Sequence, residues 1–484
     1  MSLFIKKPLA QLMAQSDDST KGLKRTLGAA NLVALGVGAI IGAGLFVRTA
    51  WAASEAAGPA VTISFVVAAI GCAFAGLCYA EFASMIPIAG SAYTYAYATL
   101  GEFLAWVIGW ALILEYALAS ATVSIAWSEY LNNLLGGAIP YQLCHSPLET
   151  SVDGIQGIIN LPAVGILVIL TLLLIKGTQE SAFVNAIIVF LKVAIVLIFI
   201  FVGWKFINPS NHVPFMIPEG TPGHEAFRQH GFGGILGGAA IVFFAFIGFD
   251  AVSTAAQEAK NPKRDMPIGI LGSLFFCTIL YILFSYVLTG VAPWQDFAVA
   301  GKEASVAYAI QHYMPGYDWL ATLVSIAILA GFSSVILVML MGQSRVFYSM
   351  SVDGLMPKLF SELHPKFRTP YKSNMLLFVF VGLFAAFVPG SMAGDLTSFG
   401  TLFAFVLVCA GVWVMRVKNP EAVRPFATPM VPLVPILGML VCSTLIFSLD
   451  PNTQLVALGW MLFGLVIYFV YGKAHSNLRK NSGA

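Results

Sequence analysis

Hydrophobic residues are gathered in long apolar runs that short polar segments interrupt. A helix that crosses a membrane needs about 20 mostly apolar residues, and most of the runs reach or approach that length. Taking each run between two polar breaks predicts twelve membrane-spanning helices, of which the fourth and ninth are the shortest. The predicted spans are Ala29–Ala50, Ala60–Ile86, Phe103–Leu131, Leu161–Leu174, Ala182–Trp204, Gly234–Gln257, Ile268–Val291, Trp319–Met341, Met375–Val388, Leu396–Val414, Val431–Phe447 and Leu455–Tyr471.

The positive charges predict how the chain is oriented. An even number of spans places both ends of the chain on one side of the membrane. Of the 25 lysine and arginine residues, 20 fall in the tails and loops on that side, and cytoplasmic segments carry such an excess. We therefore expect a multi-pass protein of the plasma membrane with both termini cytoplasmic. The longest external loops are then 132–160 and 205–233.

The composition excludes several classes of function. Of the 484 residues, 58% are hydrophobic and 10% are charged, whereas soluble globular chains carry roughly 25% charged residues. The net charge of +2 provides no basic field for nucleic acid. The six cysteines form no CxxC motif, and the sequence offers no Ser/His/Asp set, phosphate loop or metal-ligand cluster. We expect neither an enzyme nor a bound cofactor.

Glycines crowd the middle of the first span, at positions 36, 38, 42 and 44 in GVGAIIGAGLF. One interpretation is close packing against neighbouring helices. The other is a broken helix, because glycine is unfavourable inside a helix and unpaired backbone at membrane depth is tolerated where it lines a cavity. A break at 40–44 frees the amide N–H groups of Ala43 and Gly44 at the positive end of a half-helix, which suits a carboxylate.

The sixth span contains GGAAIVFFAFIGFDAV, in which Gly248 and Asp250 interrupt the apolar run. This span and the first are the opening members of two five-span halves. Glycine-interrupted spans at matching positions indicate a transporter site between inverted repeats. The carbonyl groups of Phe244, Ala245 and Ile247 can accept hydrogen bonds from an ammonium group. A carboxylate at the first span and an ammonium at the sixth together describe an α-amino acid.

Lys192 lies near the centre of the fifth span, at the depth of the two glycine breaks. A lysine there costs about 3 kcal/mol on membrane insertion. It is either a structural residue bonded to helix-end carbonyls or a proton carrier, since burial favours the neutral amine. Ser333 and Ser334 in the eighth span are weak evidence singly, because serine often bonds its own helix. With Lys192 they form a candidate polar cluster.

Glu115 lies inside the third span, so its carboxyl group must face protein or water. It is a candidate for a gate or a substrate-selectivity residue. If the substrate carries a cationic side chain, Glu115 is the acid that the sequence offers to neutralise it.

These segments resemble the amino acid–polyamine–organocation (APC) superfamily, and within it the cationic amino acid transporter (CAT) family with its bacterial proton-coupled relatives. The resemblance covers about residues 25–470. The stretches that carry it are GAIIGAGLFV (38–47), CYAEFASMIPIAGSAYTYAYATLGEFLAWVIGWALILEY (78–116), KGTQESAFVN (176–185), FFAFIGFDAVSTAAQEAKNPKRDMPIGI (243–270) and GQSRVFYSMSVDGLMP (342–357).

The resemblance implies an all-α integral membrane protein with 12 transmembrane helices in a LeuT-like fold that works by alternating access. Two inverted repeats of five helices, 29–204 and 234–414, are followed by two peripheral helices within 431–471. Cytoplasmic tails occupy 1–28 and 472–484.

The resemblance also implies roles for single residues. The substrate carboxylate meets the amides of Ala43 and Gly44, and its ammonium meets a set of carbonyls: Ile40, Phe244, Ala245 and Ile247. Lys192 corresponds to a fifth-span lysine that replaces a sodium ion in proton-coupled relatives, and Ser333 matches the eighth-span hydroxyl near it. Ala43 departs from the Ser or Thr of many members, so a hydroxyl contact to the carboxylate is lost.

Phe332 aligns with a position that limits the substrate side chain in bacterial relatives. A phenyl ring there favours alanine, glycine, serine or threonine. We therefore predict a secondary active transporter that imports small neutral L-amino acids by symport with H⁺. The alternatives are a transporter or facilitator of arginine, lysine or ornithine and, further off, a non-transporting sensor or a channel. Membrane lipid is an expected partner; the resemblance leaves open a sterol or a single-span membrane peptide, which nothing in the sequence requires.

Overall fold

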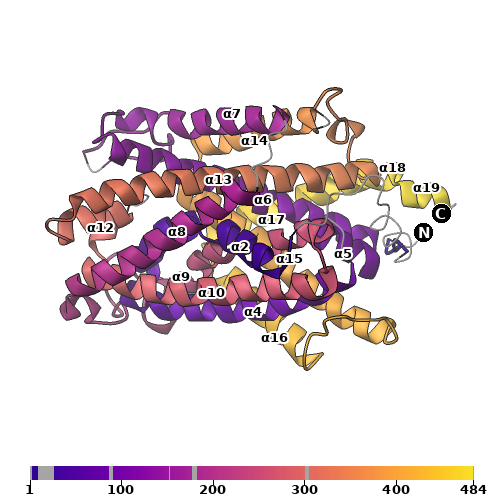
Figure 1. The fold of residues 1–484 in the computed structure, drawn as a ribbon, viewed down its shortest axis with the longest axis horizontal. Helices are drawn as coiled ribbons and strands as arrows, with labels where there is room; N and C mark the ends of the chain where they lie inside the picture. Colours follow the sequence, from indigo (N-terminus) through magenta and orange to yellow (C-terminus); the bar gives the residue numbers. More distant parts are fainter. Residues whose placement is uncertain are drawn as a thin grey trace.

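A computed structural model describes residues 3–8, 27–86, 91–151, 153–176, 182–299, 305–367 and 369–482. Within these ranges the chain is helical, with two isolated bridges and no β-strand. The long helices run side by side along the longest axis of the molecule (Figure 1). Most of the predicted N-terminal tail, 1–28, lies outside the described residues. The prediction of an all-α integral membrane protein is confirmed.

The apolar runs coincide with helices, and several of these, among them Pro262–Val291 and Asp318–Val352, reach further into polar sequence than the predicted boundaries. Eight helical segments in the described part are long and apolar enough to cross a membrane, and four apolar helices are shorter. The principal helices are α2 (Ala29–Ile40), α4 (Val61–Met85), α6 (Glu102–Leu134), α7 (Leu161–Lys176), α8 (Ala182–Gly203), α9 (Gly231–Val242), α10 (Pro262–Val291), α13 (Asp318–Val352), α14 (Tyr371–Phe387), α15 (Gly390–Lys418), α16 (Leu433–Ser448) and α17 (Pro451–Ile467).

Smaller helices lie between these. The sequence did not predict α5 (Ser91–Thr99), whose tyrosines 93, 95 and 97 are buried against the bundle. The remaining α-helices are α3 (Thr49–Ala52), α11 (Asp296–Val299), α12 (Ser305–Tyr313), α18 (Lys473–His475) and α19 (Asn477–Ser482).

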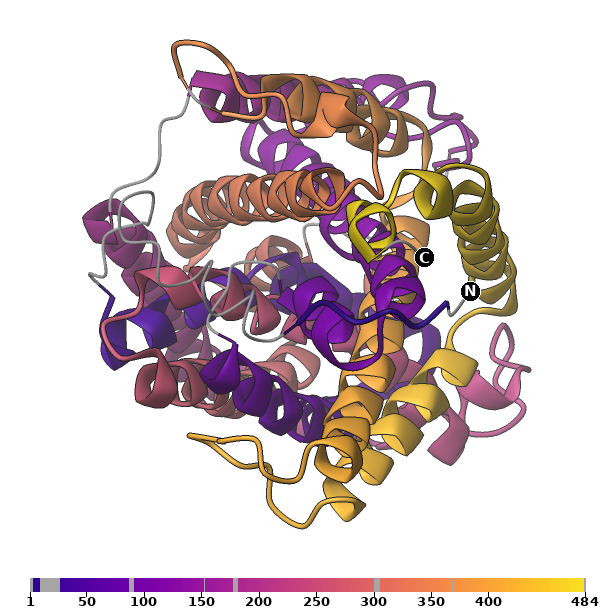
Figure 2. The same cartoon turned by 90° about the vertical axis from the view of Figure 1, so that its right-hand side faces the viewer.

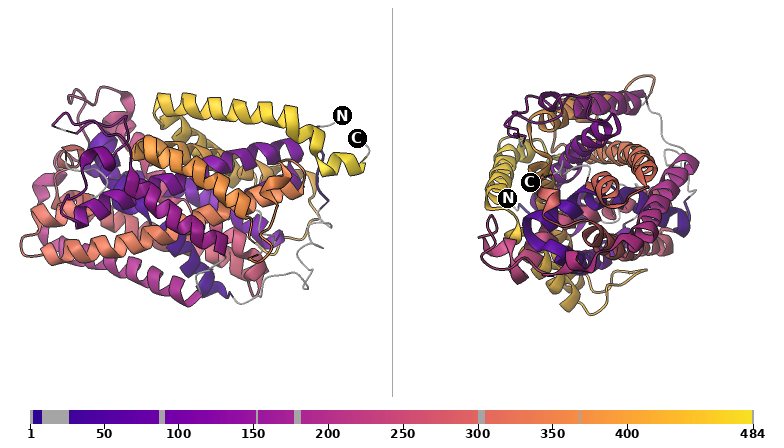
Figure 3. Two further views of the ribbon diagram at one scale, coloured as in Figure 1. Left: turned by 90° about the horizontal axis from the view of Figure 1, so that it is seen from above. Right: turned by 90° about the vertical axis from the view of Figure 1, so that its left-hand side faces the viewer.

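The last long helix lies at the edge of the molecule. In Figure 3 the yellow α17 runs along the outside of the bundle. Large apolar side chains on it are exposed, including Leu455 at 70% and Leu462 at 54%. Because such side chains are stable against lipid tails and not against water, this surface indicates a helix that borders the bilayer.

Both described ends of the chain lie at one end of the bundle, onto which Figure 2 looks directly. The backbone of Ile5 accepts a hydrogen bond from the amide of Glu102 (2.8 Å), and Lys7 Nζ pairs with Asp353 at 3.0 Å. At the other terminus, Arg479 Nε donates to Glu102 Oε1 at 2.6 Å. The two terminal segments therefore meet at the start of α6.

At the opposite end of α6, His145 lies in the 132–160 loop and its Nε2 is 2.9 Å from Glu129 Oε1. Burial lowers the pKa of His145, but the hydrogen bond and charge of Glu129 outweigh it, so its pKa is raised above 6.5. A raised folded-state pKa contributes stability below pH 6.5 that is lost as pH rises through that pKa. We expect the melting-temperature difference between wild type and His145→Gln to be largest below pH 6.5 and to vanish in alkaline buffer. A difference that grows with pH would contradict the pair's role.

Candidate functional site

The first predicted span is broken. Helix α2 ends at Ile40, and Ile41 is extended, with φ −73° and ψ 103°. The chain becomes helical again at Gly44 and continues through Ala57. The amides of Leu45 and Phe46 both donate to the carbonyl of Gly42, so Ala43 and Gly44 stand at the start of the new helix. Amides at a helix start have no partner within that helix and face anions favourably.

The sixth predicted span is broken at the same depth. Helix α9 passes into a tight turn, Phe243–Phe246, and Ile247 is extended. Gly248 has φ +118°, a conformation that side chains other than hydrogen rarely adopt. Its Cα faces the backbone of Ala39, 2.9 Å from where a Cβ would stand. The glycine therefore permits both the reversal and the close approach of α2.

The two breaks touch each other. A Cβ on Gly44 would lie 2.7 Å from the backbone nitrogen of Ala245, so only hydrogen fits between the two segments. The hydroxyl of Tyr281, on α10, lies 2.9 Å from the carbonyl oxygens of both Ile40 and Ala245 and hydrogen-bonds to both. Tyr281 thus ties together two of the four carbonyls predicted to receive the ammonium group. A carbonyl oxygen has a second lone pair, so both remain able to accept.

Aromatic rings surround this junction. The ring of Phe332 lies 6.3 Å from that of Phe46 and 5.8 Å from that of Tyr130. Phe332 is 1% exposed and Phe244 is 5% exposed. The carbonyl of Phe46 accepts a hydrogen bond from Ser305 (2.9 Å). Phe332 thus stands in the apolar wall beside the breaks, where the sequence predicts a limit on side-chain size.

Lys192 reaches the N-terminal half of the first span from α8. Its Nζ donates to the carbonyl of Gly38 at 2.8 Å, and the side chain is 3% exposed. Its aliphatic stem packs on Gly331 of α13, where a Cβ would lie 2.7 Å from Lys192 Cε. The lysine therefore lies between spans one and eight, as the resemblance implies.

The two predicted serines lie on α13, the helix that also carries Gly331. Ser333 donates to the carbonyl of Leu329, one turn back on its own helix, at 2.9 Å. Ser334 is buried. The contact of Lys192 with α13 includes Gly331, and the cluster with the two serines stays a prediction.

Glu115 is fully buried on α6. Its backbone adjoins Gly400 of α15, and its carboxyl group lies within hydrogen-bonding reach of Asp250, the residue that opens the helical turn after the second break. The structure therefore places Glu115 beside the C-terminal half of the sixth span rather than in the apolar wall around Phe332.

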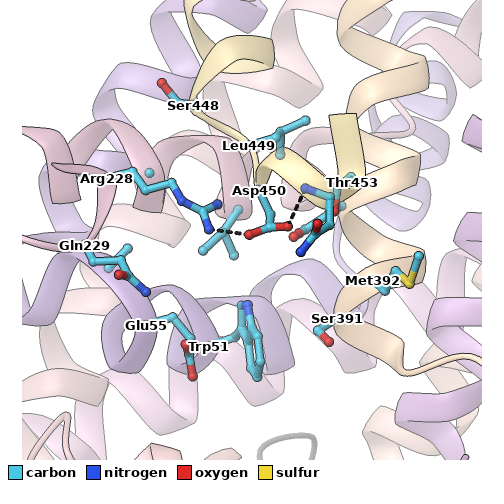
Figure 4. A pocket seen from close by; sticks show the side chains of 15 residues that line it. Trp51, Glu55, Arg228, Gln229, Ser391, Met392, Ser448, Leu449, Asp450 and Thr453 are labelled. Atoms are coloured by element: carbon cyan, nitrogen blue, oxygen red, sulfur yellow. Dashed lines mark hydrogen bonds and ion pairs between the residues drawn. The ribbon is translucent and has the colours of Figure 1, made fainter. Parts of the chain in front are cut away.

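An ion pair and a pocket lie on the side of the breaks away from the termini. Arg48, which follows the first break, pairs with Asp395 of α15, and both are buried. The Arg48 guanidinium stands over the Phe244 ring at 5.9 Å. Beyond Asp395 opens a cavity of about 290 Å³, across which Arg228 pairs with Asp450 (Figure 4). The Arg48–Asp395 ion pair lies between this cavity and the breaks, because Asp395 lines the cavity and Arg48 contacts Phe244.

Three of these residues escaped the sequence interpretation: Arg48, Asp395 and Tyr281. Arg48 lies near the end of the first predicted span, and Tyr281 lies within an apolar run. The sequence does show an arginine, Arg48, and an aspartate, Asp395, at two apolar runs. That these two side chains pair with each other follows only from the fold.

The molecule has apolar helices of membrane length, and two of its predicted spans are broken where their backbones face each other. These features define a helical membrane transporter. The family model described as amino acid permease matches residues 27–475, and the chain belongs to this family. Members of the family are transporters and not enzymes, which confirms both the predicted resemblance and the prediction that this chain is no enzyme.

The chain is similar to several curated proteins. The branched-chain amino acid permease BcaP of Bacillus subtilis (strain 168) is 46% identical over 482 residues, 99% of each chain. The methylthioribose transporter of the same organism is 42% identical and is covered completely, over 99% of this chain. The vacuolar cationic amino acid transporter 4 of Arabidopsis thaliana is 34% identical over 87% of this chain and 68% of its own.

Proposed function

We propose that this permease imports small neutral L-amino acids by symport with a proton. The observation that carries the proposal is the pair of facing breaks. Helix-start amides at Ala43 and Gly44 suit a carboxylate, and the carbonyls around Ile40, Ala245 and Ile247 suit an ammonium group. An α-amino acid presents these two groups on one carbon, which matches two breaks in contact.

The fold proposed for this activity is LeuT-like, with 12 spans and inverted repeats at 29–204 and 234–414. Both termini are proposed to be cytoplasmic in a bacterial inner membrane. The placement of α2 and α9 as the broken helices of the two halves supports this, because inverted-repeat transporters bind substrate at such breaks. Arg48 and Asp395 then close the external side, and their separation opens the path from the outer pocket to the breaks.

Proton coupling is assigned to Lys192. Burying a charged ammonium group is costly, and burying the neutral amine costs less. Loss of its proton releases the contact with Gly38, so the charge state of Lys192 biases the inner half of the first span. Ser333 remains a candidate member of this site, since a serine hydroxyl bonded to its own helix can turn to a second partner.

Apolar surroundings favour a neutral substrate over arginine or lysine. Phe46, Phe332 and Tyr130 occupy the space beside the breaks, and an ionised side chain buried against them would lack a partner. A branched-chain amino acid is the second candidate, because the 46% identical relative is named a branched-chain amino acid permease. The two candidate substrates differ in the size of their side chains, and the ring of Phe332 limits the space for that side chain.

A thermal-shift panel of purified protein with all common amino acids tests the substrate class. A ligand that binds the folded state raises the melting temperature by mass action. We expect alanine, serine and threonine to stabilise wild type, and Phe332→Ser to extend stabilisation to leucine and isoleucine. Stabilisation of wild type by leucine with no response to alanine would favour the branched-chain candidate. Stabilisation by arginine would overturn the neutral class.

A further inference from the structure

Two carboxyl groups meet on the inner side of the second break. Glu115 comes from α6, and Asp250 opens the segment Asp250–Glu258 that follows Gly248. Both residues are 0% exposed, and their carboxyl groups lie within hydrogen-bonding reach of each other. Helix α2 contacts Gly248, just before this segment, through Ala39, while Lys192 donates to the carbonyl of the neighbouring Gly38.

If both Glu115 and Asp250 were ionised, their carboxylate oxygens would have too few hydrogen-bond donors around them. Asp250 Oδ2 accepts from the Tyr116 hydroxyl at 2.7 Å. Asp250 Oδ1 and both oxygens of Glu115 are buried and make no hydrogen bond of normal geometry with the described residues, although the Thr401 hydroxyl lies close to Glu115 and the backbone amides of Gly248 and Asp250 lie close to the Asp250 carboxyl group. The nearby Thr401 hydroxyl donates to the carbonyl of Thr397 at 3.1 Å. Two carboxylates offer acceptors only, so a single proton between them supplies the missing donor.

Among the described residues, no lysine, arginine or histidine that could replace that proton interacts with Glu115. The titratable groups that face the pair are three tyrosine hydroxyls: Tyr79 of α4, Tyr95 of α5 and Tyr116 of α6. Adjacent buried carboxylates without a counter-ion cannot both ionise cheaply.

We propose that Glu115 and Asp250 share one proton, the same coupled proton that Lys192 handles, and that the pair binds and releases it during the transport cycle. The proposal rests on proton-coupled transport as the function. Asp250 follows the hinge at Gly248, whereas Glu115 is fixed on the long helix α6. When the carboxyls meet, one hydrogen bond forms and holds a proton. When the hinge parts them, that bond breaks, both become carboxylates, and the proton leaves to the inner side.

The test compares Glu115→Gln with Glu129→Gln, the same substitution at the outer end of the same helix. Protein in liposomes is assayed for alanine accumulation driven by a pH gradient and for exchange of alanine at equal pH. Wild type and Glu129→Gln should accumulate alanine about tenfold per pH unit, since one proton carries 1.36 kcal/mol per unit. Glu115→Gln should keep exchange and change the pH profile of accumulation or lose accumulation.

Infrared spectroscopy of the same proteins measures the proton directly. A band of a protonated carboxyl group should be present at neutral pH in wild type and Glu129→Gln and absent in Glu115→Gln. Asp250→Asn should remove it too, which guards against misfolding of one variant. A wild type without the band, or a Glu115→Gln variant that accumulates alanine with the wild-type pH profile, overturns the shared proton.

The two proposals can fail separately. If wild type shows no accumulation in a pH gradient, proton symport is wrong, and the infrared band still decides whether the pair holds a proton. If arginine binds wild type tightly and loses that binding in Glu115→Gln, the pair binds a cationic side chain and the shared proton is wrong.

Discussion

Gly44→Ala is expected to lower amino acid uptake by about tenfold or more while the protein still inserts into the membrane. By helix propensity alone, alanine for glycine stabilises a helix by about 1 kcal/mol. At this position the added Cβ would overlap the backbone of Ala245, 2.7 Å from its nitrogen. Overpacking of this kind costs about 1–3 kcal/mol, and here it pushes apart the two segments that form the proposed substrate site.

Gly42→Ala is the matched control, two residues away in the same motif. Its Cβ would meet only the end of the Val335 side chain, at 3.3 Å, which can shift. Uptake in liposomes should fall by about tenfold or more in Gly44→Ala, the factor that 1.4 kcal/mol produces, and far less in Gly42→Ala. Equal losses in the two variants would show that contact between the breaks is not what transport requires.

Lys192→Met is expected to end accumulation of substrate against its gradient. Methionine keeps an apolar stem to pack on Gly331 and removes the group that donates to Gly38. Methionine cannot bind a proton, so a pH gradient can no longer change the conformation of the first span through this residue. Accumulation should then fall from about tenfold per pH unit, the value for one coupled proton, to simple equilibration.

Lys205→Met, in the turn that follows α8, serves as the control. It should accumulate substrate as wild type does. Sodium should restore nothing in Lys192→Met, because the proposed coupling ion is H⁺. Unchanged accumulation by Lys192→Met at every pH would remove the lysine from the coupling mechanism.

The sequence determined the helices and the breaks. A lipid bilayer leaves no water to satisfy a peptide group, so an apolar run of sufficient length must be helical. This rule works locally, which is why α10 and α13 lie where the apolar runs are, with ends that extend into polar residues. The glycines at 42, 44 and 248 pointed to the interruptions because their effect on a helix is local as well. The helix α5 was missed, since its tyrosines do not form an apolar run.

Only the tertiary structure decided which side chains meet. Arg48 and Asp395 are 347 residues apart, and Tyr281 joins carbonyls from two other helices. Glu115 and Asp250 each read as an isolated acid, and their contact depends on how α6 packs beside the second break. A polar group in the membrane must find a partner. The sequence shows that the requirement exists, whereas the identity of the partner depends on packing between helices that are distant in the chain.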